Sequence, residues 1–444
     1  MTNAFSTFRA AGAGSPAASW EGSGEERFLR AGVGYDGPAG GLTVDANPAM
    51  TTASNRTLPS ICFVGLRNLP VLAPEYGHLG VGGAELQQTL LARALARKGY
   101  RVTMVVADYG QSDGATWSGV QTYKAFQPEA GLPVLRFLHP RWTGLWSALG
   151  RANADIYYTS CAGALVGQVA MYTKLHHRKL VFRIASNSDC DPNSLLVRFW
   201  RDKRLYRYGL RRADVILSQT PEQHAALLQN FSLDSRVLPS LTAEPGERRS
   251  FRDRDIDVLW VGNIRALKRP DVLLRLAREL PERRFEMIGG PMPGSEALYE
   301  SVQAEAASIP NVKFHGSVPY HAVGDFYSRA RILVGTSEIE GFPNTYLQAW
   351  NHGSPVVAFL DPQQLLSWHA LGRSVQTFEE MKAAVASLCA DLAAWEPVSR
   401  RCLDYMESRC SETKTLVPYM DALASLRVSS ARSAMGARRF NGAA

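Results

Sequence analysis

The sequence contains no long run of apolar residues. No stretch reaches the ~18 apolar residues that a membrane-spanning helix needs. The N-terminus also lacks a basic start followed by an apolar core, which is the pattern of a secretion signal. These absences predict a cytoplasmic protein without a membrane-spanning helix, and they leave open a peripheral contact with the inner face of a membrane.

Paired cysteines and acidic metal motifs are also missing. The six cysteines form no Cys-x-x-Cys pair and show no metal-ligand spacing. We therefore expect most of them to be buried side chains in a reducing compartment. No acidic motif of the kind that holds a diphosphate through a divalent cation is present. The sequence thus predicts neither a metal site nor a bound cofactor.

The composition favours packed domains with an excess of basic charge. Of the 444 residues, 45% are hydrophobic, which argues against overall disorder, and the length allows two or three domains. The net charge of +8 suits anionic partners such as nucleotide phosphates, anionic lipid or nucleic acid. No nucleic-acid-binding signature accompanies the charge, so we do not expect nucleic acid as a partner.

Apolar runs that end in glycine or polar residues alternate with helix-like segments. This order predicts an α/β fold with parallel sheets, which bind ligands at the carboxyl ends of their strands. We expect domains at 58–240 and 257–426, joined by a charged linker at 241–256. Residues 1–57 are rich in small residues without periodicity, and 427–444 are a basic tail, so both are predicted to be disordered.

The most specific pattern is a strand, a turn and a helix near residue 340. An apolar run at 332–335 leads into a turn that contains Glu340, a helix follows, and 356–359 is the next strand. The free N–H groups at such a helix start can hold a phosphate. Glu340 lies just before the helix, where it can accept hydrogen bonds from ligand hydroxyls. The pattern predicts a site for a sugar nucleotide.

This stretch resembles the signature of the retaining family 4 glycosyltransferases. The resemblance rests on Glu340, Gly341, Phe342, Pro343, Asn344, Gln348, Ala349, Trp350, Gly353, Ser354, Pro355, Val356 and Val357. It implies the GT-B fold, two Rossmann-like domains facing across a cleft, with the acceptor on the first domain and the nucleotide-sugar on the second. The last helices of such enzymes often return to the first domain.

The resemblance also assigns roles around the donor. Glu340 would hold donor sugar hydroxyls, and backbone N–H groups near Phe342, Asn344 and Thr345 would help to hold the phosphates. The family has a second glutamate, which contacts the ribose, where this chain has Gln348. Glutamine can still exchange hydrogen bonds there, but the substitution leaves the choice of nucleotide open.

Two further loops belong to the expected donor site. Gly82 and Gly83 look like the glycine-rich opening of the family's first domain, whose backbone approaches the donor phosphate. After the strand at 257–262 the family has an arginine and a lysine that grip the diphosphate. Lys268 matches the lysine, Asn263 stands at the place of the arginine, and Arg265 could substitute for it. Fixed cations stabilise a leaving diphosphate because it gains negative charge.

The family commonly has a histidine beside the donor sugar at the end of the strand at 180–185. Here that place is Ala185 or Ser186. Ser186, Asn187 or Asp189 could supply the polar contact with the donor sugar, and Asp189 could instead orient an acceptor hydroxyl. An equally weighted alternative is that Asp189 and Asp191 cap the following helix.

Two basic segments in the first domain have open interpretations. Residues 132–142 mix apolar and basic side chains, which favours a packed helix with arginines reaching solvent over a membrane-surface segment. A helix expected at 193–212 carries seven Lys and Arg residues. A solvated face is the default for such a run, and contact with anionic lipid is the alternative.

The sequence therefore predicts a metal-independent retaining glycosyltransferase of the hexosyltransferase type. It would move a sugar from a nucleotide-diphospho-sugar to an acceptor hydroxyl in the synthesis of a bacterial polysaccharide, glycolipid or other glycoconjugate. The family implies attack from the face that the diphosphate leaves, without a protein general base. Two alternatives remain: a sugar-nucleotide epimerase of the same fold, and a catalytically inactive transferase-like partner protein, which the residues Asn263, Ala185 and Gln348 motivate.

Overall fold

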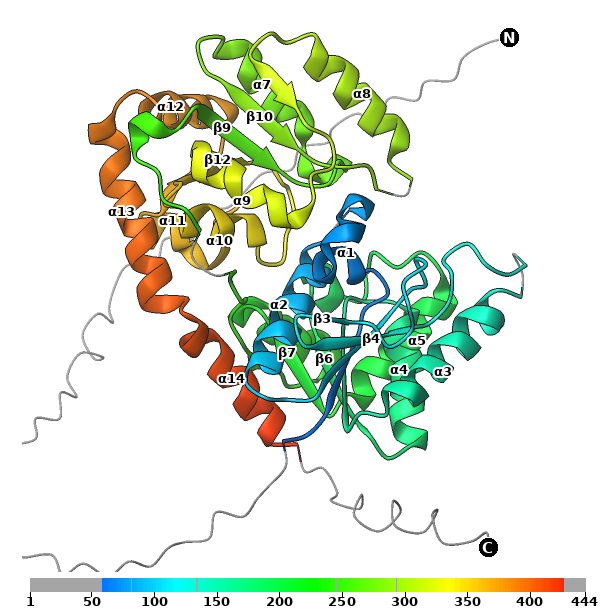
Figure 1. The fold of residues 1–444 in the computed structure, drawn as a ribbon. Coiled ribbons are helices and arrows are strands. Elements are labelled where there is room, and N and C mark those ends of the chain that lie inside the picture. Colours follow the sequence, from blue (N-terminus) through cyan, green and yellow to red (C-terminus); the bar gives the residue numbers. More distant parts are fainter. Residues whose placement is uncertain (1–57, 81, 133–134, 244–245, 293, 427–444) are drawn as a thin grey trace, which may run out of the picture. The chain divides into compact units, whose positions relative to one another are not determined.

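The computed structural model describes residues 58–426, apart from 81, 133–134, 244–245 and 293. The segments for which the sequence predicts disorder, 1–57 and 427–444, lie outside the described residues. The described residues from Leu58 onward belong to one compact unit, and they form two sheets with helices packed against them (Figure 1). In this part of the chain no helix combines the length and apolar character needed to cross a membrane.

The first sheet has eight strands, and neighbouring strands run parallel except β3 and β4. Alternate residues of β1 enter different core clusters: Ile61 and Phe63 one cluster, Cys62 and Val64 another. Burial on both sides explains why this strand is apolar at every position. In spatial order the strands are β3 (Thr116–Trp117), β4 (Val120–Lys124), β2 (Val102–Val106), β1 (Ile61–Val64), β5 (Ile156–Ser160), β6 (Lys179–Arg183), β7 (Val215–Ser218) and β8 (Arg236–Val237). The helices are α1 (Leu69–Leu72), α2 (Gly83–Arg97), α3 (Thr143–Ala152), α4 (Ala164–Leu175), α5 (Trp200–Arg212) and α6 (Pro221–Phe231).

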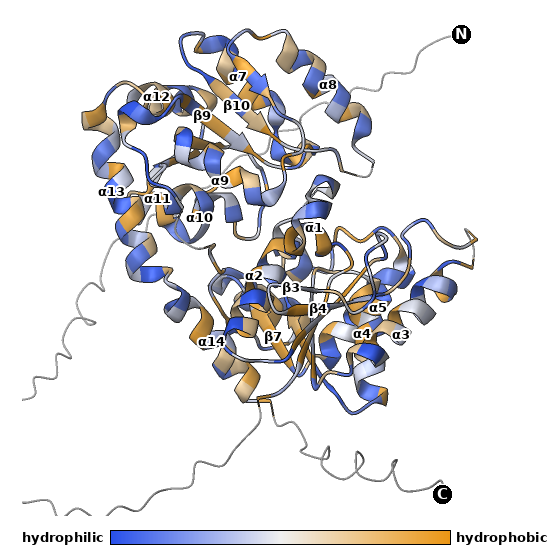
Figure 2. Cartoon of the chain, viewed as in Figure 1, coloured by the Kyte–Doolittle hydropathy of each residue, from blue (hydrophilic) through white to orange (hydrophobic). Residues whose placement is uncertain are grey.

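The second sheet has six strands, and all neighbouring pairs are parallel. Its strands and helices share a core cluster that includes the fully buried Trp350, and the apolar strands are the orange arrows in Figure 2. In spatial order the strands are β11 (Val312–Phe314), β10 (Phe285–Ile288), β9 (Ile256–Val261), β12 (Ala330–Gly335), β13 (Val356–Ala358) and β14 (Gly372–Ser374). The helices are α7 (Pro270–Glu279), α8 (Glu296–Ala307), α9 (Tyr320–Arg329), α10 (Asn344–Asn351), α11 (Leu365–Trp368), α12 (Phe378–Leu388) and α13 (Leu392–Arg409).

The second domain begins before the end of the expected linker. Phe251 packs in the core cluster of the second sheet. The buried Arg254 donates to the Ser354 hydroxyl at 2.9 Å and to the His352 carbonyl at 2.6 Å. Because these contacts fix the chain on the second sheet, residues from 251 belong to that domain rather than to a linker.

The last described helix, α14 (Glu412–Ala424), packs on the first domain. Helix α13 contributes Trp395, Val398 and Cys402 to the second core cluster, whereas α14 contributes Leu416 and Tyr419 to the cluster around β1 and β2. The chain therefore passes from one domain to the other between α13 and α14, the orange and red helices of Figure 1.

Both basic segments of the first domain differ from the predicted helices. Among the described residues of the segment at 132–142 there is a π-helical turn, η2 (Phe137–Trp142), of which no residue is buried. The helix expected at 193–212 begins at Trp200. Asp191 accepts a hydrogen bond from the Asn193 N–H at 2.8 Å, and such a turn competes with helix formation.

Candidate functional site

A cavity of about 840 Å³ lies at the carboxyl ends of the parallel strands and is lined from both domains. The first domain contributes the loops after β1, β5 and β6 and the start of α2, and the second contributes the loops after β9, β10 and β12 and the start of α10. This is the place where parallel sheets bind ligands. The predicted residues that line the cavity are Gly82, Gly83, Ser186, Asn187, Asn263, Arg265, Lys268, Glu340, Gly341, Phe342, Pro343, Asn344, Thr345 and Gln348.

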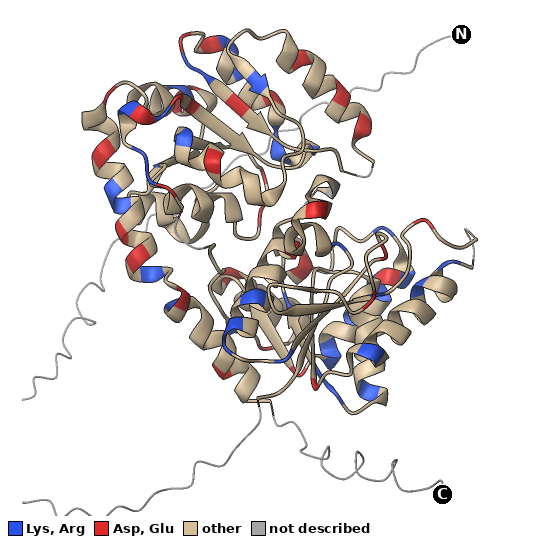
Figure 3. Cartoon of the chain, in the orientation of Figure 1, with Lys and Arg blue, Asp and Glu red and all other residues tan. Residues whose placement is uncertain are grey.

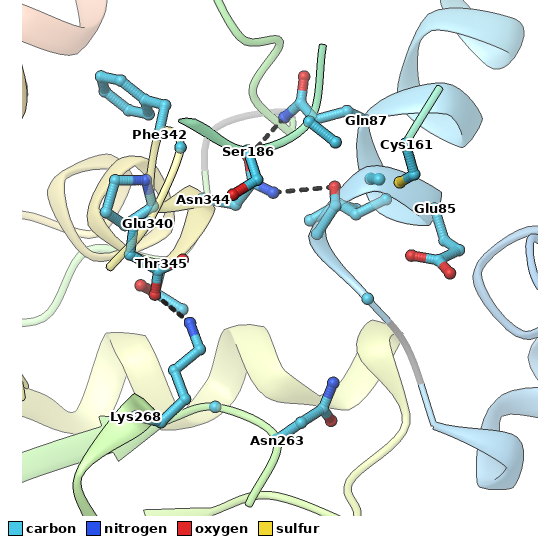
Figure 4. Close-up of a pocket in the computed structure, with 18 of the residues that line it drawn as sticks. Glu85, Gln87, Cys161, Ser186, Asn263, Lys268, Glu340, Phe342, Asn344 and Thr345 are labelled. Atoms are coloured by element: carbon cyan, nitrogen blue, oxygen red, sulfur yellow. Dashed lines mark hydrogen bonds and ion pairs between the residues drawn. The ribbon is translucent and has the colours of Figure 1, made fainter. Parts of the chain in front are cut away.

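Lys268 and Glu340 form an ion pair at the cavity wall (Figure 4). Both side chains are about one-fifth exposed, at 22% and 21%. The Lys268 carbonyl accepts the Thr336 hydroxyl at 2.6 Å, and this hydroxyl accepts the Trp260 indole N–H at 2.9 Å. The loop that carries the lysine is therefore fixed against the end of β12, and the cation has a defined place beside the carboxylate.

Helix α10 begins at the cavity wall, and its first residue connects the two domains. The Asn344 carboxamide donates to the Gly83 carbonyl and accepts from the Gln87 carboxamide, both at 2.9 Å (Figure 4). The Phe342 N–H donates to the Gln219 carboxamide at 3.1 Å. No side chain of the described residues caps α10. The partial positive charge at this helix start is thus available to an anion in the cavity.

Gln348, one turn into α10, has its carboxamide held by a tyrosine. Its Oε1 accepts the Tyr327 hydroxyl at 2.9 Å. Tyr327 is buried, and this burial raises its pKa well above the ordinary value. The hydroxyl therefore stays protonated and can donate a hydrogen bond. A glutamate carboxylate at position 348 would accept this hydrogen bond equally well.

Asp189 holds the turn after β6 and is not among the residues that line the cavity. Its carboxylate is buried and accepts the N–H groups of Ala185 at 3.0 Å and Ser186 at 3.2 Å. It forms a capping box with Ser186 at the start of η3 (Asn187–Cys190). Burial raises the pKa of Asp189 to about 6, against the lowering effect of these backbone hydrogen bonds. These contacts agree with the capping alternative, because the side chain fixes the turn that presents Ser186 and Asn187.

Sequence reasoning did not predict several polar residues of the first domain that line the cavity, and three of them carry chemistry that could matter here. Arg67 follows β1, Cys161 follows β5, and Glu85 lies in the first turn of α2; all three line the cavity. An Arg67 nitrogen lies 3.9 Å from the Met292 sulfur of the second domain. A signal was available for Arg67 and Cys161, since Cys161 directly follows the buried strand β5 and Arg67 lies in the loop after the buried strand β1.

The cavity has cations on both sides. Lys268 and Arg265 lie on the second domain and Arg67 on the first, while Glu340 and Glu85 supply negative charge. The arrangement can hold a diphosphate between the two cations of the second domain and the start of α10. Within the described residues, no three His, Cys, Asp or Glu side chains are grouped as metal ligands.

Two family models match the chain. "Glycosyl transferase 4-like domain" matches residues 82–240, and "Glycosyl transferases group 1" matches 255–391. D-inositol 3-phosphate glycosyltransferase 2 of Catenulispora acidiphila is 33% identical over 33% of this chain and 40% of its own length. The corresponding enzyme of Frankia alni is 30% identical over 32% and 41%. The matches therefore span about 40% of the length of these relatives.

Solved structures share the fold at low sequence identity. Sucrose-phosphate synthase of Thermosynechococcus elongatus superposes with a TM-score of 0.63 at 17% identity, over 83% of this chain and 100% of that one. HepE of Anabaena, solved with UDP and glucose, gives 0.62 at 15% identity over 83% and 100%. WaaG, involved in lipopolysaccharide biosynthesis, gives 0.58 at 14% over 82% and 100%. These likenesses confirm the predicted GT-B fold with two parallel-sheet domains.

Proposed function

Because the chain belongs to the group 1 glycosyltransferases, we propose that it moves a hexosyl group from a nucleotide-diphospho-sugar to an acceptor hydroxyl with retention of configuration. One observation carries the proposal. Lys268, Glu340 and the start of α10 meet in a single cavity that both domains line. These are the groups that a diphosphate and a sugar with several hydroxyls need.

The donor diphosphate would lie between Lys268, Arg265 and the N–H groups that begin α10. The positive charge of these groups takes the place of a divalent cation, so the proposed reaction is metal-independent. Glu340 would accept hydrogen bonds from the sugar, and Gln348 would contact the ribose. HepE was solved with UDP and glucose, which makes uridine diphosphate sugars the first donors to test.

The proposed reaction forms a bond between the acceptor oxygen and the anomeric carbon. On the same face, the bond between that carbon and the phosphate oxygen breaks. The acceptor proton passes to the leaving phosphate, so the products are a glycoside and a nucleoside diphosphate. Lys268 stabilises the negative charge that develops on the leaving oxygen.

The acceptor would enter from the first domain, where Arg67, Glu85 and Ser186 line the cavity. An acceptor used in making a polysaccharide, glycolipid or other glycoconjugate fits this proposal. The similar proteins include enzymes named for inositol 3-phosphate and one involved in lipopolysaccharide biosynthesis. The proposed place of action is the cytoplasm.

Donor binding is tested with a thermal-shift panel of UDP, GDP, ADP and their sugar nucleotides, with and without EDTA. A ligand at a hundred times its dissociation constant adds about 2.7 kcal/mol to the stability of the folded state. We expect one nucleotide series to stabilise the protein equally well in EDTA. Stabilisation by none of them would contradict donor binding and favour an inactive partner protein.

Transfer is then tested by release of the nucleoside diphosphate in the presence of candidate acceptors. Retention is read from the anomeric coupling constant of the product by NMR. Conversion of the donor to another sugar nucleotide without acceptor would identify an epimerase instead, and inversion at the anomeric carbon would refute the retaining mechanism.

A further inference from the structure

Large apolar side chains are exposed on two segments of the first domain. Leu135 and Leu138 lie around η2, and Leu196, Phe199 and Trp200 lie at the start of α5. The exposed fractions of these five residues run from 52% to 70%. Exposed apolar groups of this size, gathered in one place, mark a surface that binds another partner.

Arg201 joins the two segments. Its guanidinium carbon lies 3.5 Å from the centre of the Phe137 ring and 6.0 Å from that of Phe199. We call the exposed face formed by 135–138 and 196–204 the docking surface. It combines segments that are about sixty residues apart in the sequence, so neither segment reveals it alone.

The docking surface is strongly basic. Arg198 lies 5.3 Å from the Phe199 ring and Arg204 lies 5.1 Å from the Trp200 ring. Between residues 195 and 212 the sequence has one acidic residue, Asp202, and this residue pairs with Arg201 at 2.8 Å. Figure 3 shows the Lys and Arg residues of α5 in blue. Cations beside exposed aromatic rings are typical of groups at a membrane–water interface.

The docking surface is attached to the core, so its side chains are held in place. The rings of Phe137 and Trp142 lie 5.5 Å apart, those of Trp142 and Trp146 lie 6.1 Å apart, and Trp146 meets Tyr172 at 5.9 Å. Behind α5, Tyr206 and Leu210 are fully buried in a core cluster. This aromatic series reaches from the surface into α4, where Tyr172 is buried.

The docking surface adjoins the entrance to the cavity. Leu196 is 70% exposed and also lines the cavity, together with Asp191 and Ser194. A partner on this surface would thus lie beside the first-domain side of the site. The basic charge argues against a second copy of this chain as that partner, since two like-charged surfaces repel each other.

We propose that the docking surface binds an anionic lipid bilayer. Phe199, Trp200 and Leu138 enter the interface between headgroups and acyl chains, while Arg198 and Arg204 meet the anionic headgroups. This contact goes beyond the proposed transfer reaction and does not depend on it. It would place the entrance of the cavity at the membrane surface, where a lipid-linked hydroxyl is within reach.

The test measures flotation of the full chain with vesicles. One set contains phosphatidylcholine alone, and the other contains phosphatidylcholine mixed with phosphatidylglycerol. We expect binding to the anionic vesicles to be about tenfold stronger and to weaken as salt is added. Absence of binding to the anionic vesicles, or equal binding to both sets, would overturn the proposal.

Variants assign the contact to the docking surface. Trp200→Ser and Phe199→Ser should each reduce binding several-fold, and neither residue lines the cavity. Trp368→Ser is the matched control, because Trp368 is 77% exposed on α11 of the second domain. The melting temperatures of all three variants without nucleotide should match that of the wild type, which shows that they fold. An equal loss in the Trp368 variant, or a dimer that Trp200→Ser dissociates, would refute a bilayer as the partner.

Discussion

At the scale of single residues, the ion pair of Lys268 and Glu340 has a consequence for catalysis. The two side chains are paired, so a diphosphate that binds the lysine would compete with Glu340. Binding of the donor would then free the carboxylate for sugar hydroxyls. In the proposed reaction, Lys268 would have its largest effect when the leaving phosphate gains charge, and Glu340 when the sugar is held.

Lys268→Ala is therefore expected to lower kcat/KM about a hundredfold, since a charge-assisted contact contributes roughly 1.5–3 kcal/mol. The measurement is the initial rate of transfer at limiting donor, with the melting temperature as a check on folding. Lys313→Ala is the control, because Lys313 is an exposed cation of β11 away from the cavity. An active Lys268→Ala enzyme would exclude the lysine as the diphosphate ligand.

Asp189 predicts a pH dependence of stability. Its folded pKa of about 6 lies above the ordinary value of 3.8, so the folded state binds a proton more tightly than the unfolded chain. The resulting stabilisation is complete below pH 3.8 and is lost as the pH rises through about 6. Wild type should thus gain stability relative to Asp189→Asn between about pH 7 and about pH 4.

Denaturant titrations of both proteins across this pH range measure the difference. Asp191→Asn is a control of opposite sign. The backbone N–H of Asn193 lowers the pKa of Asp191, so its stabilisation is present above the unfolded pKa and is lost as the pH falls. A wild-type advantage over Asp189→Asn that does not change with pH would contradict the raised pKa.

At the scale of elements, α4 and α5 cross at two glycines. A Cβ on Gly167 would lie 2.4 Å from the Leu205 carbonyl oxygen, and one on Gly209 would lie 2.6 Å from the Val166 carbonyl carbon. The helix axes can approach closely because neither position has a side chain. Helix α5 carries the docking surface on its outer side, so this crossing also fixes where that surface lies.

Gly209→Ala is expected to destabilise the protein by about 1–3 kcal/mol, since the backbone of α4 must move away. Gly150→Ala is the matched control in α3, where the nearest atom to an added Cβ is the Tyr172 hydroxyl at 3.8 Å. At this position, alanine should leave the free energy of unfolding unchanged or raise it by roughly 0.5–1 kcal/mol, because alanine has the higher helix propensity. Equal effects of the two variants on unfolding in urea would show that the helices do not meet as closely as described.

The elements that could be predicted from the sequence are those with local causes. Strand β12 and the start of α10 follow from an apolar run, a turn and a helix, and the same pattern led to Glu340 and Gln348. The start of α5 could not be found in this way. The basic residues of α5 extend back to Arg198, so the sequence gives no sign of where the helix begins. The turn at Asp191 precedes the helix, which starts only at Trp200. The sequence leaves Asp189 open between a ligand contact and a helix cap, and its burial and its two N–H partners favour the cap.

At the scale of the whole molecule, α14 connects the end of the described chain to the first domain. The Tyr419 hydroxyl donates to the Pro239 carbonyl at 2.8 Å. The guanidinium of Arg183, which lines the cavity, lies 5.8 Å from the Tyr419 ring. Loss of α14 contacts should thus affect the first domain, although the preceding helix packs on the second.

Leu416→Ala tests this connection. Leu416 is buried in the core cluster around β1 and β2, so its truncation should cost about 2–5 kcal/mol of first-domain stability. Val417→Ala changes the next residue of the same helix, which is 44% exposed, and should cost well under 1 kcal/mol of stability.

Hydrogen exchange of the backbone amides reports on the stability of each domain separately. Faster exchange in β1 and β2 with unchanged exchange in β9 and β12 is the expected result, because α14 packs on the first sheet alone. Equal exchange in both variants would mean that α14 does not stabilise the first domain.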